Sequence, residues 1–501
     1  MAGIGFVLRE LDRRDTISGS LSSAGHGMVV AAGPWIFTVV SLALIHRGTS
    51  TFLTSDVSYN FRSFVMYAFA ISLLATAPFA NVAVRLASDD IYDRTFSGVR
   101  ARFLSALFIG CLASTGTALA VHLFVFGLSG NDLVLAVGST GVVALIWPTL
   151  AFCGAVRDYR GITTGFAVGM LVSILGTIWV ARQGLGAPAM VGMFLLGLAI
   201  VFFALASRIL VAFPDQTGML ATHLAELVKG LRQHWMLAGG SLAAIAAIWA
   251  DKWIMWFGPD QVILSNGLFS APAYDGAMFL AYLVMIPALG LFVTAIETTF
   301  FEDSRRLFDA IQGQAPLVRI ERLAGALEKQ SYRMVYRVLL TLGALCAVTI
   351  LLSPMLVPIL GLQYHQLGIF RLGILAAFFQ FMFVAATSIV LFLDRQARFL
   401  ALQLVFLASQ VLFTMVSIHL GQEYFGYGHL LACAVSACLA MAVLDNTLSK
   451  VVFLTFATAF RHPTGRTVAA PVRKKAPSPI EIEEEILPVL PILQSGPLLR
   501  P

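Results

Sequence analysis

Twelve long apolar runs constrain the fold of this 501-residue chain more than any other feature of its sequence. A helix needs about 20 mostly apolar residues to cross the hydrocarbon core of a bilayer, and each run is long enough. Helices are expected because lipid satisfies no backbone polar group. The sequence therefore predicts an all-α, polytopic membrane protein with twelve transmembrane helices. We place the spans near residues 24–45, 64–86, 103–127, 133–155, 161–181, 189–213, 237–257, 276–299, 335–360, 369–393, 399–420 and 428–457.

The composition agrees with a chain that is mostly embedded in lipid. It is 58% hydrophobic and 12% charged, whereas a soluble domain carries roughly 25% charged residues. The formal net charge of +6 does not indicate a nucleic-acid partner, because the basic residues are spread over short loops rather than gathered in one patch. The five cysteines and nine histidines show no metal-ligand spacing, so we expect no metal site.

Basic residues outside the spans indicate the orientation of the chain. If the amino terminus is cytoplasmic, only Arg47, Arg62, Arg182 and Arg371 lie on the outer side, and the other lysines and arginines of the loops lie inside. Such an imbalance follows the positive-inside rule and agrees with an even number of spans. Both termini are therefore expected in the cytoplasm.

Loop 214–236 divides the spans into two groups of six, an organisation typical of transporters built from two structural repeats. This loop and loop 301–334 have helical periodicity, and we expect both to lie along the cytoplasmic membrane face. The tail after Arg461 is rich in proline and charge, which is typical of disorder; a docking segment for a cytoplasmic partner is the alternative. The predicted regions are 1–23 (cytoplasmic amphipathic N-terminus), 24–213 (N-terminal six-helix half), 214–236 (cytoplasmic linker), 237–457 (C-terminal six-helix half, with loop 301–334) and 458–501 (disordered cytoplasmic tail).

Prolines in the first, second and eighth predicted spans could bend these helices. Gly33-Pro34 lies near the middle of the first span, and Pro78 and Pro287 occupy similar depths in the second and eighth. Proline removes a backbone donor and kinks a helix. These positions are hinge candidates, with a packing adjustment as the alternative.

The seventh predicted span contains the strongest local signal, Asp251 followed by Lys252. An ionisable side chain deep in the membrane costs roughly 2.5–3.5 kcal/mol on insertion scales, so both residues need partners or water. Adjacent helix positions point about 100° apart, and we therefore expect that the two do not simply neutralise each other. At 1.5 Å per residue Asp251 lies roughly 21 Å along the span, a depth that the antiparallel eighth span reaches near Tyr282.

Tryptophans accompany this ionisable pair. Trp249 and Trp253 share a helical stripe with Trp256, and the apolar faces of sugar rings could stack on such indoles. An interfacial aromatic belt explains Trp256 equally well. The predicted substrate path consists of Trp249, Asp251, Lys252, Trp253 and Tyr282. The alternative is that Lys252 snorkels outward while Asp251 pairs with a polar group between helices.

Glu297, near the cytoplasmic end of the eighth span, is the candidate coupling acid. It could carry a proton through a transport cycle, or it could form an ion pair with Arg305 or Arg306 at the membrane surface. The chain contains no Walker A sequence, Gly-rich dinucleotide loop, HExxH or GxSxG motif. We therefore expect neither an enzyme nor a bound cofactor.

A set of motifs extends from the amino terminus through the eighth predicted span. They are Met1 to Phe6, Leu8-Arg9, Leu11, Gly33-Pro34-Trp35, Asp251-Lys252-Trp253, Tyr274-Asp275, Ala277 to Tyr282, Ile286 to Leu289 and Glu297-Thr298. By these motifs the chain resembles the inner-membrane transporters of the Pel exopolysaccharide system (PelG-like), within the multidrug/oligosaccharidyl-lipid/polysaccharide flippase superfamily.

The resemblance implies export of a nascent, N-acetylgalactosamine-rich glycan across the bacterial inner membrane for a biofilm matrix. It also implies a complex with a cytoplasmic glycosyltransferase, a cyclic-di-GMP-binding membrane receptor and a further membrane subunit. Loops 214–236 and 301–334 are then the expected docking surfaces for these partners.

Three other functions stay open. A lipid-linked oligosaccharide flippase needs several cations to hold a diphosphate, whereas only Lys252 is deep and Arg371 lies near the outer face. A cation-coupled drug antiporter needs an ion-binding carboxylate in its first six spans, which contain none away from their ends. A scaffold subunit of a polysaccharide synthase complex would not transport at all.

Overall fold

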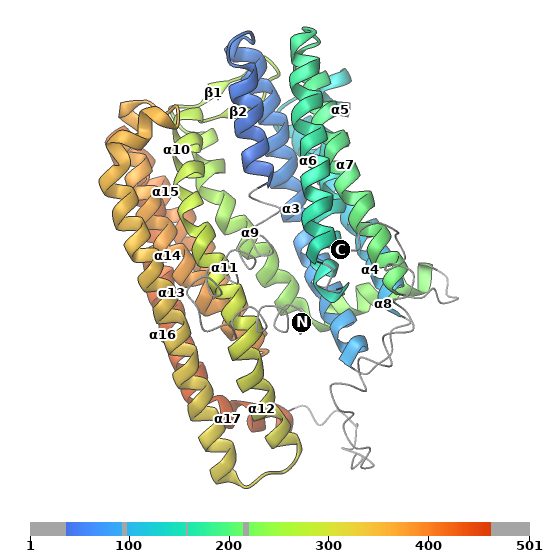
Figure 1. The fold of residues 1–501 in the computed structure, drawn as a ribbon, viewed down its shortest axis with the longest axis vertical. Helices are drawn as coiled ribbons and strands as arrows, with labels where there is room; N and C mark the ends of the chain where they lie inside the picture. The colour runs from blue at the N-terminus through green and yellow to red at the C-terminus, as the bar shows by residue number, and fades with distance from the viewer. Residues whose placement is uncertain (1–36, 93–97, 157–158, 214–219, 462–501) are drawn as a thin grey trace, which may run out of the picture. The chain divides into compact units, whose positions relative to one another are not determined.

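The computed structural model describes residues 37–92, 98–156, 159–213 and 220–461. Helices dominate these ranges (Figure 1). After a helix over 37–49, the first part of the chain forms α3 (Ser55–Tyr92), α4 (Val99–Ala120), the π-helical turn η2 (Val121–Val125), α5 (Gly130–Val156), α6 (Tyr159–Arg182), α7 (Gly186–Ala212) and α8 (Leu220–Gln233). The second part forms α9 (Trp235–Trp256), β1 (Val262–Ile263), β2 (Phe269–Ser270), α10 (Pro272–Tyr282), η3 (Leu283–Met285), α11 (Ile286–Ala295), η4 (Ile296–Phe300), α12 (Phe301–Gln312), α13 (Leu317–Ile359), η5 (Tyr364–Gln366), α14 (Leu367–Phe392), α15 (Gln396–Leu420), η6 (Gln422–Tyr424), α16 (Tyr427–Ser449) and α17 (Val451–Arg461).

Ten helices in the described ranges are long and apolar enough to cross a membrane, so the chain is a multi-pass membrane protein. The helix α9 is not among the ten, because Asp251, Lys252 and four tryptophans reduce the apolar character of its 22 residues. The first predicted span, 24–45, lies largely outside the described residues. The total of twelve spans and the cytoplasmic location of both termini therefore stay predictions.

The helices of unit Met1–Ser449 pack in two groups. Helix α3 contacts α4, α5 and α7, α5 also contacts α4 and α7, and α6 packs on α7. In the second group α9 packs on α15, α10 packs on α14, and α16 packs on both α14 and α15. The groups meet where α3 lies along α9, and Asn81 of α3 donates to Ser241 of α9 at 2.8 Å.

The last predicted span, 428–457, is wrong at its end, because α16 stops at Ser449. Its 23 residues already measure about 35 Å, which is enough to cross the hydrocarbon core. The following helix, α17, belongs to a second compact unit, Lys450–Pro501.

Loop 301–334 differs from its prediction. The segment continues the neighbouring spans as α12 and the start of α13 (Figure 1), instead of lying along the membrane face. Helix α13 is continuous over 43 residues, or about 64 Å at 1.5 Å per residue, whereas the hydrocarbon core is about 30 Å thick. The hairpin of α12 and α13 therefore extends beyond the membrane.

The hinge candidates have different surroundings. Gly33 and Pro34 lie outside the described residues. Pro78 is inside the uninterrupted helix α3, whereas Pro287 is in the first turn of α11, directly after the η3 turn that interrupts the eighth predicted span. Because proline has no backbone N–H, the break between α10 and α11 follows from Pro287.

A short antiparallel hairpin, β1–β2, joins α9 to α10 and pairs Val262 with Ser270. Its turn contains Gly267 at φ +81°, a left-handed conformation that glycine adopts without strain. The turn contacts the first two turns of α3. The Asn60 amide donates to Ser265 at 2.6 Å, Ser265 donates to Asp56 at 2.9 Å, and the Asn266 amide donates to Ser63 at 3.2 Å. We call these five residues the hairpin clasp; it joins the two helix groups at one end of α3.

Candidate functional site

Helix α9 places Asp251 and Lys252 in direct contact. The Lys252 Nζ atom lies 3.1 Å from Asp251 Oδ1 and 3.2 Å from Oδ2, and it also donates to the backbone oxygen of Ile248 at 3.4 Å. The expectation that adjacent positions would not neutralise each other is therefore wrong. The Cβ directions do diverge, but the flexible four-carbon stem of lysine lets the ammonium fold back over its own helix.

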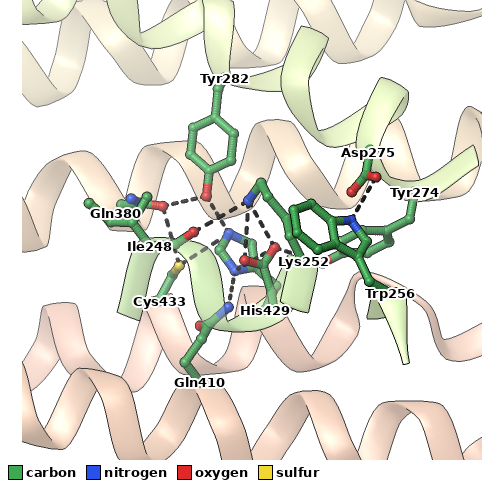
Figure 2. Close-up of polar contacts among 11 residues, drawn as sticks. Ile248, Lys252, Trp256, Tyr274, Asp275, Tyr282, Gln380, Gln410, His429 and Cys433 are labelled. Carbon is green, nitrogen blue, oxygen red and sulfur yellow. Dashed lines mark hydrogen bonds and ion pairs between the residues drawn. The ribbon is translucent and has the colours of Figure 1, made fainter. Parts of the chain in front are cut away.

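Asp251 is the centre of a hydrogen-bonded cluster inside the second helix group. Figure 2 labels Lys252, Tyr274 and His429, which contact it. Its side chain is fully buried. The Tyr274 hydroxyl of α10 donates to Asp251 Oδ2 at 3.0 Å, and His429 Nδ1 of α16 lies 3.7 Å from the same oxygen. The Lys252 and Tyr274 donors compensate the desolvation of this buried carboxylate, which is expensive.

His429 connects Asp251 to further polar groups. The Gln410 amide nitrogen of α15 contacts Nδ1, and the Tyr282 hydroxyl contacts both Nε2 and the Gln380 carbonyl oxygen of α14. Cys433 Sγ lies 3.6 Å from Nε2. Because an amide nitrogen only donates, Nδ1 accepts and the imidazole is neutral, with its proton on Nε2 facing Tyr282. We call Asp251, Tyr274, Gln380, Gln410, His429 and Cys433 the buried network.

Three of the five residues predicted for the substrate path, Trp249, Lys252 and Tyr282, lie next to this network. The Lys252 side chain is 13% exposed, against 0% for Asp251, and Trp249, Trp253 and Tyr282 are also partly exposed. Lys252 Nζ lies 5.9 Å from the Trp249 ring centroid and 5.5 Å from that of Tyr282, within cation–π range. We call Trp249, Lys252 and Tyr282 the rim. Asp251 is buried and contacts the rim through Lys252. The role of Trp253 in the substrate path stays a prediction.

Trp256 does not belong to an interfacial belt, because it is buried. Its indole N–H donates to Asp275 Oδ2 at 2.9 Å. Its ring centroid lies 4.5 Å from that of Tyr67 on α3 and 6.4 Å from that of Trp249. The Tyr67 hydroxyl donates to the backbone oxygen of Phe269 at 2.7 Å. Trp256 therefore connects the second helix group to α3.

Glu297 lies in the π-helical turn η4, which is the kind of irregularity that often marks functional sites. Its expected partners are engaged in α12: Arg305 lies 3.6 Å from Asp309, and Arg306 lies 3.3 Å from Asp303. Within the described ranges, no group of three or more His, Cys, Asp or Glu side chains could hold a metal ion.

Sequence reasoning missed Gln380, Gln410 and His429. They lie on three different helices, and His429 is 147 residues from Tyr282. A signal was present for Gln380 and Gln410, because amide side chains deep in apolar spans are rare and need partners. His429 lies at the start of α16, where the sequence gives no such signal. Cys433 joins the same cluster.

Comparisons with known proteins agree with a transporter. The sequence profile of the family described as "PelG: Putative exopolysaccharide Exporter (EPS-E)" matches residues 1–456. No curated protein sequence matches the chain.

Solved structures give the fold. A MOP superfamily transporter from Pyrococcus furiosus with a binding pocket of reversed polarity is 16% identical, with 85% of this chain and 96% of that chain covered and a TM-score of 0.57. A MATE transporter in a bent conformation is 14% identical, with 91% and 99% covered and a TM-score of 0.56. An outward-facing multidrug resistance MATE transporter is 15% identical, with 84% and 95% covered and a TM-score of 0.54.

At these identities the structural likeness establishes a transporter fold of the MATE type, and the profile match covers most of the chain. Neither comparison indicates an enzyme. The chain belongs to the PelG family of exopolysaccharide exporters.

Proposed function

We propose that the protein exports a nascent, Pel-like exopolysaccharide rich in N-acetylgalactosamine across the bacterial inner membrane, for a biofilm matrix. The rim is the observation that carries the substrate class. Two aromatic rings flank the Lys252 ammonium at 5.9 and 5.5 Å, so apolar ring faces and a hydrogen-bond donor are presented together. A sugar ring offers the complementary apolar face and hydroxyl groups.

The charges at the rim favour an uncharged glycan over a lipid-linked diphosphate. Asp251 neutralises Lys252 at 3.1 Å, so little positive charge is left for phosphate oxygens, which favour charge-assisted bonds. Arg371, the other cation expected near the outer face, donates instead to Ser353 of α13 at 2.8 Å. These contacts support a polysaccharide exporter rather than a flippase for lipid-linked oligosaccharides.

A vesicle experiment tests this function. The protein is reconstituted with its glycosyltransferase, and the polymer that is protected from an external glycosidase in the vesicle lumen is measured. We expect lumenal polymer with the wild type and strongly reduced amounts with Lys252→Ala. Trp179→Ala is the control, because Trp179 is 59% exposed on α6, far along the chain from the rim. Polymer that is made but never enters the lumen would support the scaffold function instead.

We further propose that the glycosyltransferase, the cyclic-di-GMP-binding receptor and the further membrane subunit dock on α8 and on the hairpin of α12 and α13. Leu317 and Val318 begin α13 and are 58% and 69% exposed, which supports a contact there, because adjacent exposed apolar side chains favour binding. Leu317→Glu with Val318→Glu should reduce co-purification of the glycosyltransferase at least tenfold. Gln183→Glu, an exposed position in the turn after α6, should not. Equal co-purification of both variants would exclude this surface.

A further inference from the structure

Asp275 is a carboxyl group that the proposed glycan contacts do not use. It lies in the first turn of α10. Its Oδ2 accepts the Trp256 indole N–H at 2.9 Å and the Ala271 backbone N–H at 3.3 Å (Figure 2). Its Oδ1 is buried and has no hydrogen-bond partner in the described part of the chain. A buried oxygen without a partner is unfavourable, and more so when it carries charge.

The charged and titratable groups around Asp275 come from three helices. Helix α9 contributes Asp251 and Lys252, α10 contributes Tyr274 and α3 contributes Tyr67. His429 of α16 lies next to Asp251, with 3.7 Å between Nδ1 and Oδ2. The Lys252 ammonium already contacts both oxygens of Asp251. His429 is neutral, because its Nδ1 faces the amide nitrogen of Gln410.

Counting these groups gives two carboxyls, Asp251 and Asp275, against one ammonium, Lys252. With both carboxyls ionised the cluster carries a net negative charge inside a low-dielectric region, which is unfavourable. The backbone N–H groups at the start of α10 partly offset that charge, but they leave Oδ1 without a partner. One more positive charge would balance the cluster.

We propose that Asp275 binds a proton on Oδ1 and that this proton is released when α3 separates from α9. A proton fits better than a metal ion, because one unpartnered carboxyl oxygen is too few ligands for cations such as Ca²⁺, which takes six to eight oxygens. The neutral acid keeps Oδ2 as the acceptor for Trp256. Its link to export rests on the proposed function; the proton site itself does not.

The link to helix separation follows from Trp256. Its ring lies 4.5 Å from Tyr67 of α3, and Tyr67 donates to the hairpin at Phe269. Parting these contacts exposes the indole and the carboxyl behind it to water. The O–H bond of Asp275 then breaks, water takes the proton, and the carboxylate is solvated. Closing the contacts reverses each of these steps.

Infrared spectroscopy of the purified full-length protein tests the proton site. At neutral pH we expect a carboxylic-acid C=O band that shifts in D₂O, disappears in Asp275→Asn and persists in Glu297→Gln. Asp275→Glu keeps a carboxylic acid and should shift the frequency of the band without removing it. This second variant keeps the test valid if Asp275→Asn does not fold. The site is excluded if the wild type lacks the band, if Asp275→Asn retains it, or if Glu297→Gln removes it.

The hairpin clasp provides the test of coupling. In Asn60→Cys/Ser265→Cys, an oxidised pair should hold α3 against the hairpin. We expect the proton affinity of Asp275, followed by its band against pH, to be about tenfold higher in the oxidised protein than after reduction. The single-cysteine variants should show no difference. Equal affinities in both states would refute the coupling. Neither spectroscopic experiment uses a glycan. Both therefore test the proton site and its coupling even if the vesicle assay shows no export.

Discussion

His122 and His429 are both 1% exposed within apolar helices, one in each helix group. His429 has partners at both ring nitrogens, namely Gln410 at Nδ1 and Tyr282 at Nε2. His122 has none at either nitrogen among the described residues, and instead packs beside Tyr67 and Phe126 with ring centroids 5.9 Å away in both cases. The same residue type at the same burial therefore has different surroundings in the two groups.

The difference indicates where the chemistry of the protein lies. In the first group the described carboxylates lie near helix ends, such as Asp56 and Asp132 in first turns, and the buried imidazole acts as an aromatic packing residue. In the second group an ion pair is buried together with hydroxyl, amide and imidazole groups. Buried polar networks remain favourable only when nearly every member is satisfied. We therefore expect substitutions in the second group to have larger effects.

Breaking the buried ion pair should have the largest effect. Lys252→Ala leaves Asp251 uncompensated, so we expect a loss of about 3–5 kcal/mol in the free energy of unfolding and no export. Thermal unfolding and the vesicle assay measure the two effects. Arg85→Ala is the control, because Arg85 and Asp394 form an exposed pair at 3.7 Å that contributes about 0–1 kcal/mol. Normal export by Lys252→Ala would refute a role of the rim.

Locking the two groups together should have the next largest effect. Oxidised Asn60→Cys/Ser265→Cys joins α3 to the hairpin where the native side chains lie 2.6 Å apart. If export requires the groups to move, lumenal polymer should fall more than tenfold and recover on reduction. Full export by the oxidised protein would show that this end stays closed during transport.

The two histidines test the comparison directly. His429→Ala leaves the Gln410 amide nitrogen without its partner and removes one of the two partners of the Tyr282 hydroxyl, which should cost about 1–3 kcal/mol of stability. His122→Phe removes two unsatisfied nitrogens and should be neutral or stabilising by up to about 1 kcal/mol. The apparent Tm values of both variants measure these two changes in stability. A larger loss of stability for His122→Phe than for His429→Ala would contradict the conclusion that the polar network lies in the second helix group.

A smaller effect is expected at the rim. Trp249→Ala removes an aromatic contact worth about 0.5–1.5 kcal/mol, so the export rate should fall roughly two- to tenfold. Trp249→Phe should recover most of the rate because it keeps an aromatic face. If Trp249→Ala and the control Trp179→Ala behave alike, sugar stacking at the rim is excluded.

The smallest effect concerns His46, near the end of the helix over 37–49. Burial, and then Arg62, whose Nη2 lies 2.6 Å from Nδ1, lower the pKa of His46. A lowered pKa means that the folded state prefers the neutral ring, so this contribution is present above about pH 6.5 and is lost as the pH falls below that value. His46→Gln should therefore flatten slightly the fall of Tm between about pH 7 and pH 5. An unchanged slope would show that His46 contributes nothing.

The sequence predicted the membrane spans well where lipid contact alone decides them. Prediction 369–393 matches α14 (Leu367–Phe392), and 399–420 matches α15 (Gln396–Leu420). It failed at α13, because hydropathy reports contact with lipid, whereas the helix continues into an amphipathic segment. Backbone hydrogen bonding does not stop at the membrane surface.

At the candidate site, too, the sequence predicted some contacts and missed others. Depth along antiparallel helices follows from 1.5 Å per residue, and Tyr282 does lie 5.5 Å from Lys252 Nζ. Which faces of α14, α15 and α16 turn toward α9 depends on packing, which one sequence does not give. For that reason Gln380, Gln410 and His429 were not found. The reach of the lysine side chain toward Asp251 was also misjudged from Cβ directions.

The length of α13 has a mechanical consequence. Roughly half of its 64 Å lies beyond the hydrocarbon core, and Pro354 and Pro358 both lie near the far end of the helix. The segment between the core and Leu317 therefore behaves as a stiff lever. A small tilt of α13 inside the membrane is magnified at its tip in proportion to length, so any protein held there would be displaced with each movement of the second helix group. Force could equally be applied at the tip and transmitted back to α14, on which α13 packs.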